Sequence, residues 1–130
     1  MAKEKATILL VEDDTFISGM YQTKLSMLGY TVRTAMDGEA GWAELEREAP
    51  DLILLDIVLP KKDGFEVLGN IRSSDKLKNL PVILLTNLGQ KPDVQKGLEL
   101  GADDYIIKAH FTPSEVVEKI EKMLTKRATA

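Results

Sequence analysis

The sequence predicts an α/β protein in which a five-stranded, mostly parallel sheet is covered by five helices. Three short runs of consecutive apolar residues, at positions 8–11, 52–55 and 82–85, are typical of strands that are buried on both faces. Helical patterns of apolar residues separate these runs, so strands and helices alternate along the chain. Such alternation favours parallel strands joined by right-handed crossovers.

Two weaker strands complete the predicted sheet. Residues 30–34 alternate between apolar and polar side chains, and residues 104–108 form a short segment with charges at both ends. Both patterns are typical of edge strands. With three central and two edge strands, we expect the doubly wound strand order 2-1-3-4-5, which is the order of the flavodoxin-like fold.

Apolar spacing predicts the five helices, which cover residues 16–28, 37–48, a segment around 65–71, 91–100 and 112–124. Asp14 is expected to cap the first helix, and Thr112 with Glu115 forms a capping box at the start of the last one. Gly97 weakens the fourth helix. In the first two helices we expect these side chains to face the core: Phe16, Met20, Leu25 and Leu28, then Ala40, Trp42, Ala43 and Leu45.

The composition limits the classes of function. The 130 residues match one domain, with a core expected over about residues 6–125 and no output domain in the chain. The absence of cysteine excludes disulfides and thiolate metal sites, and a single histidine, His110, excludes a multi-histidine site. Without an apolar run of membrane-spanning length or a signal peptide, we expect a cytoplasmic location. The net charge of −4 gives no bulk attraction to nucleic acid or anionic lipid.

Polar side chains follow four of the five predicted strands. Glu12 and Asp13 come after the first, Asp56 ends the third, Thr86 ends the fourth and Lys108 ends the fifth. The carboxyl ends of parallel strands meet at one edge of a sheet, where ligands bind in open α/β folds. We therefore expect three acids, one hydroxyl and one ammonium to converge there.

Three neighbouring carboxylates favour a hard cation. At ~4 Å and an effective dielectric constant of about 20, each pair of like charges repels by about 4 kcal/mol. Oxygen ligands without a dedicated protein cage are typical of Mg²⁺, with Mn²⁺ as an alternative. Together with an ammonium and a hydroxyl, this is the set of groups that phosphoryl transfer requires, and an aspartate can itself act as the nucleophile.

These residues lie in motifs that resemble the receiver domain of response regulators in two-component signalling, of the chemotaxis-regulator type. The resemblance covers roughly residues 6–125. Its motifs are ILLVEDD at 8–14, DIVLP at 56–60 with Asp63 and Gly64, VILLT at 82–86, and GADDYIIK at 101–108.

The resemblance implies a role for each site residue. Asp56 is the implied phosphoacceptor, which takes its phosphoryl group from a histidine kinase or a phosphotransfer protein. Asp13, Asp56 and the main-chain carbonyl of Val58 are the implied magnesium ligands, and Glu12 is expected to hold a metal-bound water.

Three further residues carry implied roles in the response. Thr86 would bond a phosphoryl oxygen and follow it inward, Lys108 would neutralise the phosphoryl group, and Tyr105 would change rotamer as a switch residue. The implied outcome is a shift in the face formed by the fourth helix, the fifth strand and the fifth helix, which controls a protein partner.

The sequence departs from the family pattern at two positions. The family has proline after the lysine, joined by a cis bond, whereas Ala109 follows Lys108 here. A cis bond before alanine costs about 2.5–4 kcal/mol, so either the domain tolerates this strain or the bond is trans and Lys108 reaches the site differently. We favour the cis bond, because the site needs the lysine turned inward. Asn87 stands where the family prefers a small residue, and this affects access to the phosphoryl group.

Other functions remain open at this point. The chain could be a docking receiver that does not switch, a magnesium-dependent phosphatase of the haloacid dehalogenase kind, or a flavin- or nucleotide-binding module. The intact acids argue against the first, the lack of an Asp-x-Asp nucleophile pair against the second, and acids in place of a phosphate loop against the third. Asp104 and Lys119 could form a homodimer contact across the last strand and helix, although pairing within one chain or with solvent is favoured.

Overall fold

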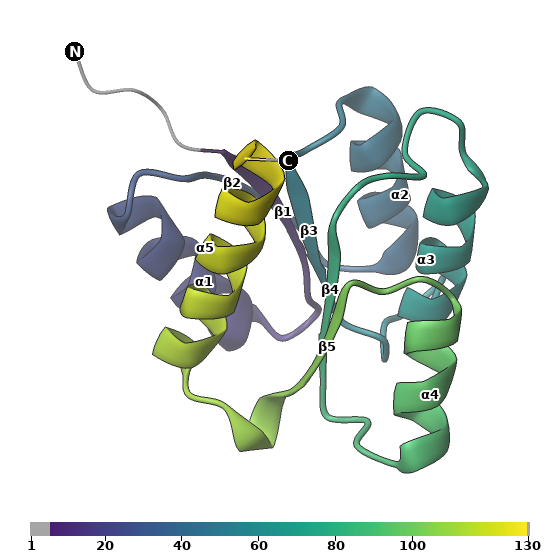
Figure 1. Cartoon of the computed structure of the whole chain (residues 1–130). Coiled ribbons are helices and arrows are strands. Elements are labelled where there is room, and N and C mark those ends of the chain that lie inside the picture. The colour runs from purple at the N-terminus through teal and green to yellow at the C-terminus, as the bar shows by residue number, and fades with distance from the viewer. Residues whose placement is uncertain (1–5, 130) are drawn as a thin grey trace.

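The computed structural model describes residues 6–129, with side chains through residue 126 (Figure 1). Five parallel strands form one sheet in the order β2-β1-β3-β4-β5, which confirms the predicted doubly wound fold. The strands are β1 (Thr7–Val11), β2 (Thr31–Ala35), β3 (Leu52–Leu55), β4 (Val82–Thr86) and β5 (Asp104–Ile107). The second strand therefore lies one residue later than predicted, and Lys108 lies just outside the fifth.

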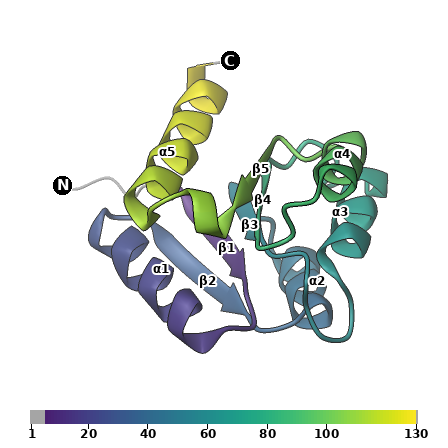
Figure 2. The ribbon, with the colours of Figure 1, turned by 90° about the horizontal axis from the view of Figure 1, so that it is seen from below.

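The five predicted helices are present and cover both faces of the sheet. They are α1 (Thr15–Met27), α2 (Gly38–Arg47), α3 (Gly64–Ser73), α4 (Lys91–Glu99) and α5 (Pro113–Thr129), with a short 3-10 turn, η1 (Lys108–His110), before α5. Helices α1 and α5 lie on one face, and α2, α3 and α4 lie on the other (Figures 1 and 2). None of these helices, over the part of the chain that the structure describes, is long and apolar enough to cross a bilayer.

The core has two layers, one on each side of the sheet. Alternating residues of the central strands point to opposite sides: Leu9 and Ile53 pack toward α2 and α3, whereas Ile8 and Leu52 pack toward α1 and α5. All four are fully buried. Burial on both faces explains why the central strands are continuous apolar runs.

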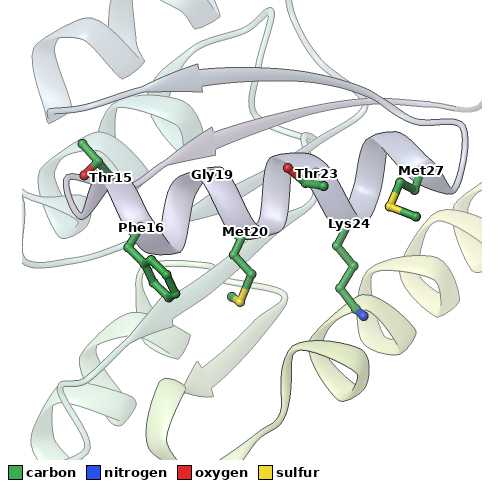
Figure 3. Close-up of a pocket in the computed structure, with 7 residues that line it drawn as sticks. All are labelled: Thr15, Phe16, Gly19, Met20, Thr23, Lys24 and Met27. Carbon is green, nitrogen blue, oxygen red and sulfur yellow. The ribbon is translucent and has the colours of Figure 1, made fainter.

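The predicted inner face of α1 is wrong at its two ends. Phe16 is 79% exposed and Leu28 is also exposed, whereas Leu25 is buried as expected. The buried residues of α1 are Ser18, Tyr21 and Leu25, at helical spacing. Met20 is partly buried and packs against the core, as expected. Phe16 and Met27 are exposed (Figure 3), so apolar residues occur on both sides of α1 and periodicity alone does not identify the inner side.

The second and fourth helices also differ from the prediction. In α2, Ala40 and Ala43 are exposed, because the helix faces the sheet through Gly38, Gly41 and Leu45. In α4, the glycine that was expected to interrupt the helix is instead its buried contact. A Cβ atom at Gly97 would lie 2.8 Å from Leu84 Cδ1 and 2.8 Å from Tyr105 Cδ2. Gly97 therefore lowers the helix propensity of α4, but it allows this helix to pack closely on the sheet.

The loop after β3 is fastened to the start of α2. The amide of Gly38 donates to the carbonyl of Pro60 at 3.3 Å, and a Cβ atom at Gly38 would overlap the carbonyl of Lys62. Lys61 has a positive φ of 69°, which is unusual for a residue with a side chain. This close approach fixes the path of the chain that follows Asp56.

Gly38→Ala is expected to lower the free energy of unfolding by about 1–3 kcal/mol, because the loop backbone must move away from the added methyl group. Urea denaturation measures the change. Gly69→Ala is the matched control: no atom would lie within 4 Å of its Cβ, so the better helix propensity should raise stability by about 1 kcal/mol. Equal effects of the two substitutions would contradict the proposed close approach.

Candidate functional site

The polar residues at the strand ends meet in one cavity at the carboxyl edge of the sheet. This cavity has a volume of about 300 Å³. It brings together every predicted catalytic and metal-binding residue, and its lining is Glu12, Asp13, Asp14, Ile17, Asp56, Val58, Thr86, Asn87 and Lys108. The parallel topology explains the convergence, because each residue follows or ends a strand that points to the same edge.

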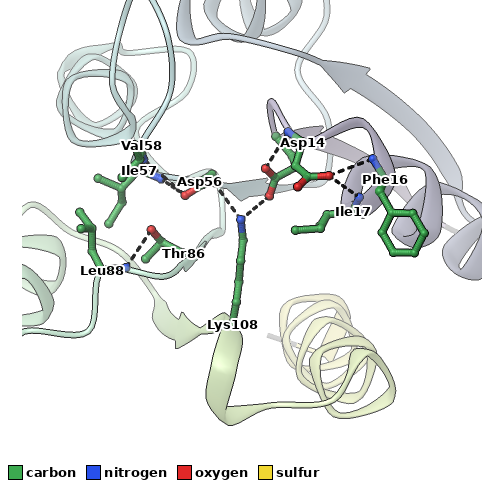
Figure 4. A network of polar contacts seen from close by, with 10 residues as sticks. Asp14, Phe16, Ile17, Asp56, Ile57, Val58, Thr86, Leu88 and Lys108 are labelled. Carbon is green, nitrogen blue, oxygen red and sulfur yellow. Dashed lines mark hydrogen bonds and ion pairs between the residues drawn. The ribbon is translucent and has the colours of Figure 1, made fainter.

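Asp56 is held in place by the backbone on one side and by a lysine on the other. It is 6% exposed. Its Oδ1 accepts hydrogen bonds from the amides of Ile57 at 2.7 Å and Val58 at 3.3 Å (Figure 4). Its Oδ2 accepts a hydrogen bond from Lys108 Nζ at 2.9 Å. The carboxylate is therefore fixed and charge-compensated at the inner end of the cavity.

Lys108 also contacts the second buried acid. Its Nζ lies 2.6 Å from Glu12 Oε1, and Glu12 is 1% exposed. Burial raises the pKa of Glu12, and the hydrogen bond from Lys108 only partly offsets this effect. For Lys108, burial lowers the pKa, but the hydrogen bonds to Glu12 and Asp56 outweigh burial and raise it, so the ammonium stays charged.

The expected cis bond between Lys108 and Ala109 is wrong. All peptide bonds between the described residues are trans. Lys108 opens the η1 turn, and from this backbone its side chain already reaches both carboxylates. The inward direction of the lysine thus comes from the turn and the long side chain, and needs no cis geometry.

The three predicted acids are close enough to share one cation. Glu12, Asp13 and Asp56 each offer a carboxylate oxygen, and these oxygens all lie within 4.8 Å of one another. In their ionised forms, the three carboxylates and the single Lys108 ammonium leave two negative charges, which suits a divalent cation with oxygen ligands. Asp14 has a different task, because its Oδ1 accepts hydrogen bonds from the amides of Phe16 and Ile17 and caps α1, as predicted.

Thr86 and Tyr105 are joined through one intervening residue, Leu88. Thr86 is fully buried, and its Oγ1 accepts a hydrogen bond from the Leu88 amide at 3.3 Å. The hydroxyl of Tyr105 donates to the carbonyl of Leu88 at 2.6 Å. Burial raises the pKa of Tyr105 to about 12, so this hydroxyl stays protonated at neutral pH. Sequence analysis did not identify Leu88, because its contribution comes from the backbone.

Two further predicted features lie outside the group of acceptor and metal-binding residues. Asn87 is exposed and lines the cavity, so it lies where the cavity meets solvent. Lys119 Nζ lies 3.5 Å from Asp104 Oδ2 within the same chain, which is the intramolecular alternative. A homodimer contact through these residues stays a prediction.

Similar known proteins support the resemblance to receiver domains that the sequence motifs indicate. A family model described as "Response regulator receiver domain" matches residues 8–121. The chain is 44% identical over 120 residues to "Probable transcriptional regulator ycf27" of Guillardia theta, covering 92% of this chain and 46% of that protein. It is 41% identical over 117 residues to "DNA-binding dual master transcriptional regulator RpaA" of a Synechocystis strain, covering 90% and 48%. The chain thus spans about half the length of these curated relatives.

Solved structures share the fold over nearly the whole chain. A receiver domain protein described as CheY-like, from Methanospirillum hungatei, superposes with a TM-score of 0.89 at 31% identity and covers 98% of both chains. The chemotaxis protein CheY4 of Vibrio cholerae has a TM-score of 0.83 at 29% identity, covering 90% of this chain and 97% of that one. From the matched family model, the site and the shared fold, the chain belongs to the response regulator receiver domains, which are phosphoacceptors rather than classical enzymes.

Proposed function

We propose that this domain is a signalling switch in which Asp56 accepts a phosphoryl group from a histidine kinase or a phosphotransfer protein. The observation that carries the proposal is the contact of Lys108 Nζ with Asp56 Oδ2 at 2.9 Å, beside two further acids. A buried carboxylate with a fixed ammonium partner is ready to act as a nucleophile, and the same ammonium can then balance the charge of the product.

In the proposed transfer, an Asp56 carboxylate oxygen forms a bond to the phosphorus atom of a phosphohistidine. The phosphorus–nitrogen bond of the donor breaks, and its electron pair returns to the imidazole, which takes up a proton. Lys108 is placed to stay beside the new phosphoryl oxygens. The hydroxyl hydrogen of Thr86 can be donated to one of them, because its Oγ1 is the acceptor in the bond to Leu88.

The residues present fit a magnesium ion, with manganese as an alternative. Asp13, Asp56 and the main-chain carbonyl of Val58 would hold the ion directly, and Glu12 would hold one of its water molecules. Such an ion, when bound, supplies positive charge that reduces the repulsion between the carboxylates and the incoming phosphoryl group. Glu12, which already bonds Lys108, helps to hold this ammonium beside Asp56.

The output of the switch is proposed to pass through the Leu88 backbone. If Thr86 turns toward a phosphoryl group, its Oγ1 pulls on the Leu88 amide, and Tyr105 bonds the carbonyl of the same residue. The ring of Tyr105 packs beside Gly97 of α4. A change at Thr86 therefore has a short physical route to the α4–β5–α5 face, which a downstream protein would read. We expect no nucleic acid or membrane contact from this domain, and a cytoplasmic location.

Asp56→Asn is expected to abolish modification by acetyl phosphate, because an amide cannot serve as the nucleophile. Intact-protein mass spectrometry measures the modification, and removal of Mg²⁺ with EDTA should abolish it equally in the unchanged protein. Asp75→Asn is the control, since Asp75 is an exposed acid far from the cavity lining, and it should be modified normally. A modified Asp56→Asn protein would refute the assignment of the acceptor. Continuous release of phosphate from small esters would instead favour the phosphatase alternative.

Lys108→Ala should slow the acetyl phosphate reaction by about 100-fold or more, which is typical for loss of a charge-stabilising donor. Lys108→Met retains most of the apolar stem and tests the charge alone. Circular dichroism of each variant checks that the fold is kept. Lys78→Ala, which removes a lysine that pairs with Asp75 at the surface, should react at the normal rate. Normal labelling of a folded Lys108 variant would contradict the proposed role.

The exposed side of α1 is the proposed contact for the phosphoryl donor. It forms a shallow hollow lined by Thr15, Phe16, Gly19, Met20, Thr23, Lys24 and Met27 (Figure 3). Phe16 and Met27 are 79% and 82% exposed. A donor must cover the mouth of the acceptor cavity, and Ile17 of α1 lines that cavity. The apolar side of α1 continues directly from this mouth, so a docked donor protein would cover it.

Phe16→Ala should slow transfer from the cognate phosphohistidine protein by about tenfold, as expected for loss of an aromatic anchor at an interface. Reaction with acetyl phosphate should be unchanged, because a small donor needs no docking surface. Radiolabel transfer kinetics measure the first rate and mass spectrometry the second. Leu98→Ala on α4, an exposed apolar residue on the opposite face, should leave both rates unchanged. Equal slowing with both donors would argue for damage to the site instead.

A further inference from the structure

A second cavity lies behind Lys108, between α1 and the start of α5. Its volume is about 150 Å³. Its lining is Ile17, Met20, Tyr21, Lys108, Phe111 and Pro113. Two of these residues, Ile17 and Lys108, also line the acceptor cavity, so the two cavities adjoin along the lysine side chain.

Tyr21 gives this cavity an unpartnered polar group. Its side chain is 5% exposed, and its hydroxyl makes no hydrogen bond with any of the described residues. Every fully buried side-chain oxygen or nitrogen among the described residues has a hydrogen-bond partner. The hydroxyl of Tyr21, which has none, must therefore contact solvent-accessible space. Burial raises the pKa of Tyr21 to about 12, so the hydroxyl is protonated and can both donate and accept.

The remaining walls are mostly apolar. Ile17, Met20, Phe111 and Pro113 contribute hydrocarbon and aromatic surface. The ring of Phe111 is covered on one side by Lys119 Nζ, at 5.1 Å from its centroid, and this contact steadies it. An apolar cavity of about 150 Å³ takes a molecule of roughly the size of benzene.

Charge selects a neutral molecule over an anion. Lys108 is the charged residue in the lining of this cavity, but its ammonium is already engaged by Glu12 at 2.6 Å and by Asp56 at 2.9 Å. An added carboxylate or phosphate would have to compete with these two contacts. A neutral ligand could instead bond the Tyr21 hydroxyl through a hydroxyl or carbonyl oxygen and leave both contacts intact.

We propose that this cavity binds a small neutral amphipathic molecule, with a ring-sized apolar body against Ile17 and Phe111 and a single hydroxyl or carbonyl oxygen at Tyr21. Such a ligand would lie against the stem of the lysine that serves Asp56. A metabolite-sized compound bound in this cavity would therefore contact Lys108 without entering the acceptor cavity.

Phenol is the test probe and toluene its isostere without the hydroxyl. Titration of the full chain, followed by heteronuclear NMR, should give saturable shifts at the methyl groups of Ile17 and Met20 and at the amide of Phe111. We expect phenol to bind about tenfold more tightly than toluene, which corresponds to one net hydrogen bond. Benzoate should bind more weakly than phenol.

Tyr21→Phe is the matched variant, because it removes only the hydroxyl oxygen from the cavity. It should bind toluene as well as before and lose the preference for phenol. Shifts that grow linearly with phenol, equal binding of phenol and toluene, or shifts confined to Thr23 and Met27 on the outer side of α1 would each overturn the proposal. The readout is binding itself, so the result does not depend on whether Asp56 accepts phosphate.

Discussion

The contact on which this molecule depends is the ammonium of Lys108 placed between Glu12 and Asp56. Two carboxylates with almost no solvent exposure cannot remain charged in the interior without a compensating cation. The sheet order sets the distance that this cation must bridge, because β4 lies between β3, which leads to Asp56, and β5, which leads to Lys108. Two strand spacings amount to about 10 Å, and the four-carbon stem of a lysine can span much of that gap. A shorter cationic side chain at this position would leave the acids unpaired.

The central strands of the sheet form both the core and the site. Each central strand contains a continuous apolar run that ends abruptly in a polar residue at the carboxyl end, as from Val11 to Glu12 and from Leu55 to Asp56. Helices cover the apolar part of the strands on both faces of the sheet. The polar residues at the strand ends precede the following helices in the chain and lie at the edge of the sheet. The loop after Asp56 packs closely against Gly38 and accepts a hydrogen bond from its amide, which helps to define the path of that loop. The fold thus stabilises an arrangement of acids that no isolated segment could maintain.

The strands and the convergence of the polar residues at their ends could be predicted from the sequence, because both follow from local patterns and one topological rule. Continuous apolar runs indicate strands buried on both faces, and parallel strands bring their carboxyl ends together. The inner side of α1 could not be predicted, because apolar residues such as Phe16 and Leu25 lie on both of its sides. The contact of Leu88 was missed because it is made by backbone groups, which every residue type has. The contact of Gly97 was missed because glycine contributes no side chain there, and this lets Leu84 and Tyr105 pack close to the helix. The expected cis bond was wrong because the η1 turn, which has no clear sequence signal, already directs Lys108 inward.

The position of Lys108 also separates the two kinds of contact that a switch requires. On one face of the sheet, α1 presents exposed apolar side chains (Figure 3), and the proposed donor would approach from there. On the other face, Thr86 is linked through Leu88 to Tyr105, which packs on α4, and the proposed change of state would be read there. Because the sheet lies between α1 and α4, a donor on α1 and a reader on α4 need not compete for the same surface. Lys108 lines both the acceptor cavity and the smaller cavity beside α1, so a ligand in the smaller cavity would contact this lysine without occupying the path through α4.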